Sequence, residues 1–189
     1  CSQAHGALID NKSVGTFGDV ATWSFCQDKI LTTGGEGGMV STSNFDLWER
    51  IWSIKDHGKS LKVINQVSDK KSFKFVHENF GNNFRMTEMQ ASIGRIQLRK
   101  LNDWKKTRTK NANKIIENLS NMSLVRIPLV PKNLEHAWYK FYAYIIPSSL
   151  KDGWTRDRII CEITEAGYPA FSGGCSEIYL EKSFIKAGL

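Results

Sequence analysis

The sequence predicts an α/β fold, because segments with the two-residue period of strands alternate along the chain with segments that have helical spacing. Residues 20–25 alternate between two sets of side chains, as a strand does. The apolar positions of residues 47–54 and 89–104 instead recur close to helical spacing. A further segment, residues 138–146, is aromatic and β-branched and predicts another strand.

The first part of the chain predicts short strands followed by a capped helix. Residues 8–26 are short apolar runs broken by turn signals at Asp10, Asn11 and Gly15. A glycine cluster lies within residues 34–38, and residues 39–42 predict another short strand. Ser43 or Asn44 can cap the next helix, whose apolar face comprises Leu47, Trp48, Ile51, Trp52 and Ile54.

The second part predicts a loop, a long helix and a shorter one. Residues 55–80 are rich in lysine and scattered polar groups and predict a long loop or lid, a kind of segment that tends to be functional or mobile. The capping-box pattern of residues 87–90 predicts a helix that begins at residues 86–87. This is either one long helix or two collinear helices that end near Asn121. Residues 155–166 predict a helix that a glycine ends.

Composition excludes several classes of protein. The 189 residues are 41% hydrophobic, which is ordinary for a globular chain. No segment approaches the ~20 consecutive apolar residues that cross a bilayer. The net charge of +7 suits an anionic ligand, either a nucleic acid or a nucleotide-linked small molecule. No C-x-x-C pair suggests zinc or a redox dithiol, so we expect reduced thiols in a cytoplasm at Cys1, Cys26, Cys161 and Cys175.

Lys29 is the residue with the clearest potential for chemistry. It lies five residues after Ser24, at the end of the predicted strand, and just before the glycine cluster. A lysine in a protected pocket can lose its proton, because desolvation disfavours the ammonium, and it can then form a Schiff base with a carbonyl. Most loop lysines are nevertheless solvated surface groups, and glycine clusters are usually turns. The surrounding motifs therefore decide the interpretation.

Five ordered blocks of the sequence form recognisable motifs. They read S-Q-A-H-G-A at residues 2–7, G-T-F-G-D at 15–19, S-F with the lysine at 24–29, G-G-E-G-G-M-V at 34–40, and G-N-N-F-R-M-T-E-M-Q-A at 81–91. In this order they resemble the pyridoxal phosphate (PLP)-dependent sugar aminotransferases of the DegT/DnrJ/EryC1/StrS family. The resemblance is specific over residues 1–104 and looser to the end of the chain. It implies part of an aspartate-aminotransferase-like (fold type I) large domain over 1–104, followed by a linking helix and most of a smaller α+β domain over 105–189.

The resemblance also implies roles for four residues near the amino end. Lys29 falls on the family's Schiff-base lysine, which we expect to be catalytic and to shuttle a proton. Ser24 matches the phosphate-binding serine, and Asn83 matches an asparagine that reaches the cofactor phosphate of the neighbouring subunit. Gln3 matches a position against the cofactor ring. The family's sugar dehydratases have histidine in place of this lysine, so Lys29 favours amino transfer over dehydration.

Other polar residues are weaker candidates. His5 could act as a base near neutral pH, but the family gives it no fixed role, and we expect it to be structural. Arg85 could pair with a carboxylate of the amino donor, although a structural role in locking the helix start to the sheet is the preferred interpretation. Glu177 and Tyr179 are substrate candidates from position alone. The acidic residues show no spacing for a metal site.

The function implied by the resemblance is transfer of an amino group from glutamate or glutamine to a keto group of a nucleotide-activated sugar, in amino-sugar or surface-polysaccharide synthesis. A homodimer with shared active sites follows from the role of Asn83. The family motif that matches residues 2–4 is preceded by Glu-Asp, whose aspartate pairs with the pyridinium nitrogen of the cofactor. We therefore expect this chain to be an internal part of a longer protein, and by itself to be inactive and to bind PLP weakly.

Two other interpretations remain open. The first is a basic anion- or nucleic-acid-binding module that would use the lysines around residues 55–74 and 105–114, although these are spread over several elements without a recognition motif. The second keeps the fold but makes it a PLP-binding regulator without turnover.

Overall fold

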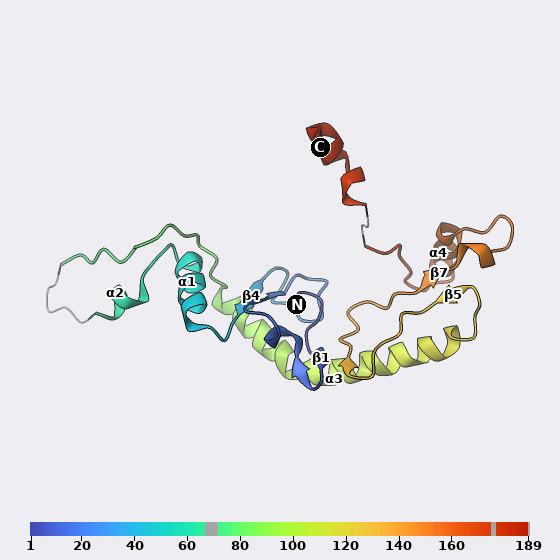
Figure 1. Cartoon of the computed structure of the whole chain (residues 1–189), viewed down its shortest axis with the longest axis horizontal. Helices are drawn as coiled ribbons and strands as arrows, with labels where there is room; N and C mark the ends of the chain where they lie inside the picture. The colour runs from blue at the N-terminus through green and yellow to red at the C-terminus, as the bar shows by residue number, and fades with distance from the viewer. Residues whose placement is uncertain (67–71, 175–176, 189) are drawn as a thin grey trace. The chain divides into compact units, whose positions relative to one another are not determined.

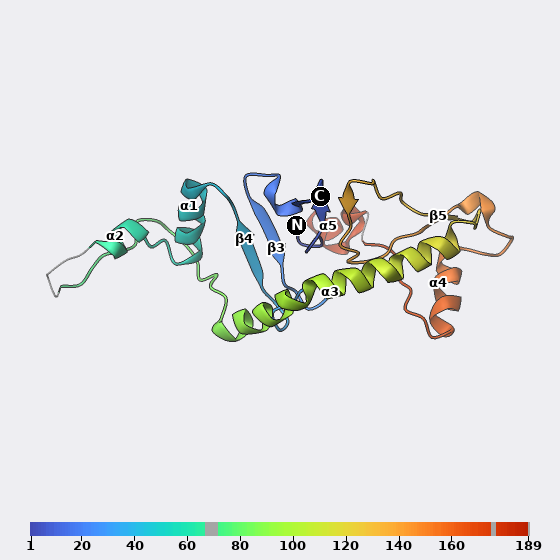
Figure 2. The same cartoon turned by 90° about the horizontal axis from the view of Figure 1, so that it is seen from below.

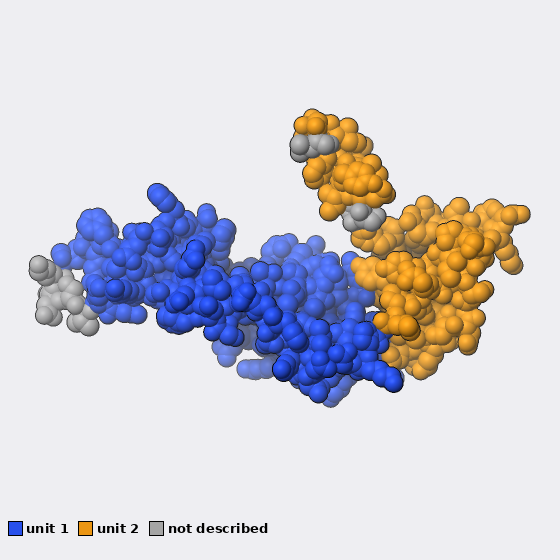
Figure 3. Space-filling model, viewed as in Figure 1, with its two compact units in different colours: residues 1–112, 130–140 blue, residues 113–129, 141–189 orange. Residues whose placement is uncertain are grey.

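The computed structural model describes residues 1–66, 72–174 and 177–188 of the chain. These form two compact units, shown in blue and orange in Figure 3. Unit 1 comprises Cys1–Ala112 and Val130–Lys140, and unit 2 comprises Asn113–Leu129 and Phe141–Leu189. Because the predicted division into 1–104 and 105–189 concerns the domains of a larger protein, it stays a prediction.

Two antiparallel strands of unit 1 lead into and out of the predicted lysine loop. β3 (Ala21–Ser24) pairs with β4 (Gly38–Ser41), with Ala21 opposite Ser41 and Ser24 opposite Gly38. The two strands lie side by side in Figure 2. The alternation that predicted the first strand is confirmed, and the whole of residues 25–37 forms the connection between the pair.

A second sheet of unit 1 brings a distant segment back to the amino end. β1 (Leu8–Ile9) pairs antiparallel with β2 (Lys12–Ser13) on one side and with β6 (Leu134–Glu135) on the other. The turn between β1 and β2 contains Asp10 and Asn11 in the left-handed region, with φ of 49° and 61°, which asparagine and aspartate tolerate well. Pairing with β6 places residues 130–140 in unit 1.

The helix cap predicted at residues 43–44 is confirmed, whereas the loop predicted over 55–80 contains a helix. α1 (Phe45–Lys55) starts at Asn44, whose side-chain oxygen accepts a hydrogen bond from the Leu47 N–H at 3.1 Å. The predicted loop over 55–80 is wrong in part, because it contains the short helix α2 (Leu61–Asn65), capped by Ser60. The paired lysines predicted to lie in this loop, Lys70 and Lys71, fall outside the described residues.

α3 is one continuous helix, Glu88–Leu119, which decides between the two alternatives left by the sequence (Figure 1). The predicted capping box is present: Thr87 N–H donates to the Gln90 side-chain oxygen at 3.0 Å, and Gln90 N–H donates to the Thr87 hydroxyl at 3.3 Å. The helix starts one or two residues later than predicted and ends close to the predicted residue.

The predicted strand over residues 138–146 is mostly wrong. Only Tyr144–Ile145 (β7) is a strand, paired with β5 (Val125–Arg126) in unit 2. Trp138 has a φ of 50°, which takes the backbone out of extended geometry. Its N–H donates to His136 Nδ1 at 2.9 Å, and its carbonyl accepts from Arg108 at 2.9 Å. These contacts override the β propensity of the aromatic residues.

The rest of unit 2 is built from short helices. η2 (Pro147–Ser149) precedes α4 (Arg156–Glu165), which Thr155 caps and which ends at a glycine with a φ of 87°, as predicted. η3 (Ile178–Leu180) and α5 (Lys182–Ala187) are elements that the sequence pattern did not predict. No helix in the described part of the chain is long and apolar enough to cross a membrane.

The best-buried apolar cluster lies in unit 1. It joins Ala7, Ile30 and Ala137, with Leu101 and Tyr139 packed against it. These residues come from the amino end, the lysine loop, α3 and the segment after β6. The core therefore fixes the loop that carries Lys29 against three other parts of the same unit.

Candidate active site

The loop between β3 and β4 is held by its own backbone. Phe25 N–H donates to the Gly37 carbonyl at 2.8 Å, and Lys29 N–H donates to the Cys26 carbonyl at 3.0 Å, which closes a turn just before the lysine side chain. Thr33 is 1% exposed, and its hydroxyl donates to the Glu36 carbonyl at 2.9 Å. The loop is therefore ordered by internal bonds despite its three glycines.

The helix α3 supports the same loop from outside. Gln90 donates to the Glu36 carbonyl at 2.8 Å, and the Gln97 side-chain oxygen accepts from the Thr32 N–H at 2.9 Å. A Cβ on Gly94 would lie 2.9 Å from the Thr33 methyl, so the helix and the loop approach closely at this glycine. Gln90, Gln97 and the close approach at Gly94 thus fix the position of the loop relative to α3.

Lys29 points at Tyr139, a residue 110 positions away in the sequence. The Lys29 Nζ donates to the Tyr139 hydroxyl at 3.4 Å and lies 4.9 Å from the centre of its ring. The Asp28 carboxylate lies 3.7 Å from the same Nζ, and the Tyr139 hydroxyl donates a short hydrogen bond to Asp28. The Lys29 side chain is 15% exposed, so the amine is partly shielded from water.

The contacts of the free Lys29 amine favour its charged form. Burial works to lower the pKa of Lys29, but the hydrogen bond with Tyr139 and the nearby Asp28 carboxylate outweigh it, so the pKa lies above its usual value. Desolvation alone therefore does not activate the free amine, and the Schiff-base role of Lys29 stays a prediction. In this state Lys29 is an ammonium ion that donates to Tyr139, and a further event must neutralise it before it can act as a nucleophile.

Tyr139 is a site residue that reasoning from the sequence missed. The only available signal was the loose family resemblance of residues 136–140, and the predicted strand there gave no reason to place a hydroxyl beside Lys29. The site geometry depends on the irregular backbone after His136, which is set by tertiary contacts and not by local pattern.

Ser24 lies where the sequence predicts, at the end of β3 and half-buried. Its hydroxyl accepts a long hydrogen bond, 3.4 Å, from the Cys26 N–H. That length is near the limit for a hydrogen bond, so the hydroxyl retains capacity for a stronger acceptor or donor. Ser24 and Lys29 thus belong to one strand end and the turn that follows it.

His5 is buried beside this strand end. Its ring lies 5.4 Å from the Trp23 ring and 5.8 Å from the Phe25 ring. Both ring nitrogens are buried without a hydrogen bond of good geometry to any described residue, although the Ser24 backbone lies close. Burial lowers the pKa of His5, so its neutral form is favoured. Buried polar groups in proteins usually have a hydrogen-bond partner, so the His5 ring is an exception.

Three further predicted residues lie at the surface of unit 1. Gln3 is exposed in the turn that precedes β1. Asn83 is exposed and pairs through its backbone with Asp56 in an isolated antiparallel bridge. Arg85 donates to the Asp56 carboxylate at 2.6 Å, at the end of α1. The guanidinium is therefore engaged in a structural ion pair, at a helix end and not at the sheet, while its role toward a substrate stays a prediction.

The remaining candidates belong to unit 2. The Tyr179 hydroxyl donates to Glu177 at 2.6 Å, and this hydrogen bond raises the pKa of Tyr179. Both side chains are exposed, and their predicted contact with a sugar stays a prediction. No group of histidine, cysteine or acidic side chains in the described segments could hold a metal ion. Of the four cysteines, Cys1, Cys26 and Cys161 are free thiols, and Cys175 lies outside the described residues.

Comparison with known proteins gives a consistent result. The family model described as "DegT/DnrJ/EryC1/StrS aminotransferase family" matches residues 1–170. A curated relative, the GDP-perosamine synthase of Escherichia coli O157:H7, is 35% identical over 139 residues, which are 74% of this chain and 35% of that protein.

Solved structures agree in fold. An aminotransferase from Psychrobacter cryohalolentis is 46% identical, with a TM-score of 0.94 over 100% of this chain and 50% of that one. The Escherichia coli GDP-4-keto-6-deoxy-D-mannose-3-dehydratase, solved with bound hydrated PLP, is 27% identical, with a TM-score of 0.77 over 96% of this chain and 47% of that one. The chain therefore has the α/β fold of an aminotransferase and spans half or less of the length of these proteins.

Proposed function

Because this chain belongs to the DegT/DnrJ/EryC1/StrS aminotransferase family, we propose that its protein is a PLP-dependent enzyme that transfers an amino group to a keto group of a nucleotide-linked sugar. The observation that carries the proposal is the position of Lys29. Its amine is partly shielded, in a loop fixed at both ends by hydrogen bonds, beside a strand-end serine. A surface lysine without a role would not need such support.

The residues present fit a phosphorylated aldehyde. Lys29 supplies a primary amine, Ser24 supplies a hydroxyl whose present hydrogen bond is long, and His5 supplies buried ring nitrogens that lack a partner. Hydrogen bonds between such donors and a charged phosphate are the stronger class. PLP, when bound, supplies an aldehyde carbon that can take an amino group from one substrate and release it to another.

Each residue of this chain then has a stated task. Lys29 Nζ holds the cofactor and, when it is free, carries the proton that moves during transfer. Ser24 binds the phosphate, and Gln3 lies against the ring. Asn83 reaches the phosphate in a neighbouring copy, so the protein acts as a homodimer with shared sites. The exposed position of Asn83 on unit 1 is compatible with that task.

The substrates follow from the same reasoning. The Escherichia coli GDP-perosamine synthase is named for a nucleotide-linked sugar, and we propose this class of acceptor for the present protein. Glutamate or glutamine is the proposed amino donor, and Glu177 and Tyr179 are proposed to face the sugar. Lysine at position 29 favours amino transfer over dehydration, the reaction for which the Escherichia coli GDP-4-keto-6-deoxy-D-mannose-3-dehydratase is named. A nucleotide sugar and an amino acid are cytoplasmic substrates, and we propose that location.

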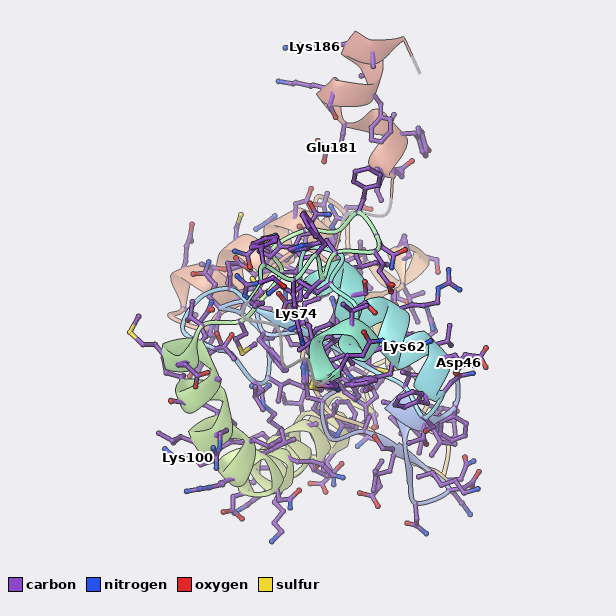
Figure 4. All side chains as sticks on the ribbon, turned by 90° about the vertical axis from the view of Figure 1, so that its left-hand side faces the viewer. Asp46, Lys62, Lys74, Lys100, Glu181 and Lys186 are labelled. Carbon is purple, nitrogen blue, oxygen red and sulfur yellow. The ribbon has the colours of Figure 1, made fainter. Side chains whose placement is uncertain are left out.

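The basic binding module is less well supported. Lys62, Lys74 and Lys100 lie on α2, on the segment after it and on α3, and so do not form one stripe on a single element (Figure 4). Lys59 pairs with Asp56 at 3.1 Å, and Lys105 pairs with Glu135 at 2.6 Å. Part of the positive charge is therefore neutralised within unit 1 and is not available to a nucleic acid.

An activity assay tests the proposal. The full-length protein is incubated with PLP, glutamate or glutamine and a panel of keto sugar nucleotides, and amino-sugar products are measured by mass spectrometry. We expect product with the unchanged protein, at least about 10³-fold less with Lys29→Ala, and unchanged product with the surface variant Lys62→Ala. Cofactor bound without product on any acceptor would favour the regulator, and no bound cofactor would contradict both.

A further inference from the structure

Tyr139 connects the two charged groups at the centre of the candidate site. Lys29 Nζ donates to its hydroxyl at 3.4 Å, and that hydroxyl donates in turn to the Asp28 carboxylate. We propose that Tyr139 is a positioning residue that holds the free Lys29 amine in place and, through these hydrogen bonds, makes it less reactive than a solvated lysine. The task of the amine rests on the proposed function, whereas the hydrogen-bonded chain itself does not.

The backbone of Tyr139 is held tightly, which fixes the position of the hydroxyl. Arg108 on α3 donates to the carbonyls of Trp138 at 2.9 Å and Tyr139 at 3.3 Å. The preceding Ala137 is 3% exposed in the core of unit 1. Two bonds from an arginine and one buried neighbour therefore leave the tyrosine ring little freedom to move away from Lys29.

A second side chain of α3, Lys105, adds to this support. Lys105, also on α3, donates to the Gly6 carbonyl at 2.9 Å and pairs with Glu135 at 2.6 Å. Glu135 itself lies in β6, opposite Leu8 of β1. The segment that carries Tyr139 is thus tied to the amino end of the chain and to the helix that supports the lysine loop.

The charged groups that face Lys29 explain why the hydroxyl matters. Asp28 and Tyr139 favour the ammonium form, and Cys26 adds to this effect. Lys140 lies 4.0 Å from Asp28 and 5.0 Å from the centre of the Tyr139 ring, so it competes for the same carboxylate. Burial lowers the pKa of His5, and the positive charge of Lys29 lowers it further, so the neutral ring is favoured. Removal of the Tyr139 hydroxyl eliminates its hydrogen bonds to Lys29 and Asp28, while the aromatic ring and the Asp28 carboxylate remain.

Amine reactivity measured against pH tests the proposal without any need for activity. The cofactor-free full-length protein is treated briefly with acetic anhydride over a pH series, and acetylation of the Lys29 peptide is followed by mass spectrometry. Only the neutral amine reacts. We expect the Lys29 profile to move to lower pH in Tyr139→Phe, with about 3- to 10-fold faster acetylation below the midpoint, which is the range that one lost hydrogen bond gives.

Two other variants make the test selective. Asp28→Asn removes the carboxylate that Tyr139 and Lys29 contact and should also move the Lys29 profile to lower pH. Tyr168→Phe, at an exposed tyrosine of unit 2, should leave the profile unchanged. Acetylation of Lys62 on α2 serves as the reference for folded protein. If Tyr139→Phe does not fold, Tyr139→Leu takes its place, because Asp28 also lies 3.7 Å from the Lys29 amine and its removal acts directly.

An unchanged Lys29 profile in folded Tyr139→Phe and Asp28→Asn would overturn the role of Tyr139. A parallel sample of unchanged protein with added PLP reports the visible absorbance of lysine-linked cofactor. Absence of that absorbance would contradict the proposed function, while the acetylation profiles would still decide whether Tyr139 controls the amine. The two proposals can therefore fail separately.

Discussion

Asp56 forms ion pairs with three basic side chains at the carboxyl end of α1. Its carboxylate lies 2.6 Å from Arg85, 3.1 Å from Lys59 and 3.7 Å from Lys55, and its side chain is 12% exposed. The same region closes the segment between α1 and α3, because Asp56 bridges to Asn83 through the backbone. Arg85, a candidate substrate residue from the sequence, thus contributes to holding the fold.

We predict that Asp56→Asn lowers the free energy of unfolding by about 1–2 kcal/mol at pH 7, since it removes hydrogen bonds between charged groups that are only partly shielded. The hydrogen bond from Lys59, and then that from Arg85, lower the pKa of Asp56 below the usual value for an aspartate. This contribution is present above about pH 4 and is lost as the pH falls through the lowered pKa. Urea denaturation at several pH values measures it.

The matched control is Asp103→Asn. Asp103 lies 3.9 Å from Lys106, and both side chains are more than 80% exposed, so little change in stability is expected. If Asp56→Asn is as stable as the unchanged protein at pH 7, or if the difference between them grows as the pH falls below 4, the structural role of Asp56 is wrong.

At the scale of residues, Lys29 could be identified from the sequence but its partner Tyr139 could not. The lysine, the serine five residues before it and the glycine cluster form a local pattern that can be read directly. The hydrogen bond of Lys29 depends on Tyr139, which is 110 residues away and lies in the irregular segment after His136. A local pattern carries no information on such a distant partner.

At the scale of elements, the loop between β3 and β4 depends on the absence of a side chain at Gly37. A Cβ built there would lie 2.1 Å from the Thr33 hydroxyl and 3.3 Å from Phe25 Cβ. Thr33 is fully buried and bonded to the Glu36 carbonyl, so it cannot move aside without breaking that bond. The turn that presents Lys29 would have to widen.

We predict that Gly37→Ala costs about 1–3 kcal/mol of stability, the usual range for overpacking a tight site, and that it reduces covalent PLP attachment. Gly18→Ala is the control, because a Cβ there meets only the Val20 carbonyl at an ordinary 3.6 Å. That variant should stay within about 0.5 kcal/mol of the unchanged protein. Thermal unfolding measures both, and equal stability of the two variants would contradict the packing argument.

Helix ends were predictable where their signals are local. Asn44 and the box at residues 87–90 make the capping bonds that the sequence indicates. The strand predicted over 138–146 failed because its backbone is set by His136 and Arg108, which are tertiary partners. Short helices such as α2 also escape detection, because five residues do not establish a helical period.

At the scale of the whole molecule, a large amount of apolar surface is exposed. Large side chains in and next to the segment between α2 and α3 are each more than three-fifths exposed: Phe73, Phe75, Phe80, Phe84 and Met89. Exposed apolar groups on this scale are unusual for an isolated globular protein. The family and its fold could be read from ordered motifs, whereas the surfaces that need a partner could be found only in the structure.

We predict that the 189-residue chain, expressed by itself, binds the dye ANS strongly and self-associates, because its apolar surface has no cover. Replacement of Phe75 and Phe80 by serine should reduce the dye fluorescence at least about twofold, while replacement of the exposed Lys62 and Lys74 by serine should not. Dye fluorescence and light scattering measure the effect. Dye binding as weak as that of a compact monomeric control protein would contradict the prediction.

The site of cofactor attachment provides the most direct test of the proposed function. The full-length protein is incubated with PLP, reduced with borohydride, digested and analysed by mass spectrometry. We expect one stable adduct per chain, on the peptide that contains Lys29 and on that side chain, and none in Lys29→Ala. An adduct confined to another lysine, or no adduct at all, would contradict the assignment of this chain to a working PLP enzyme.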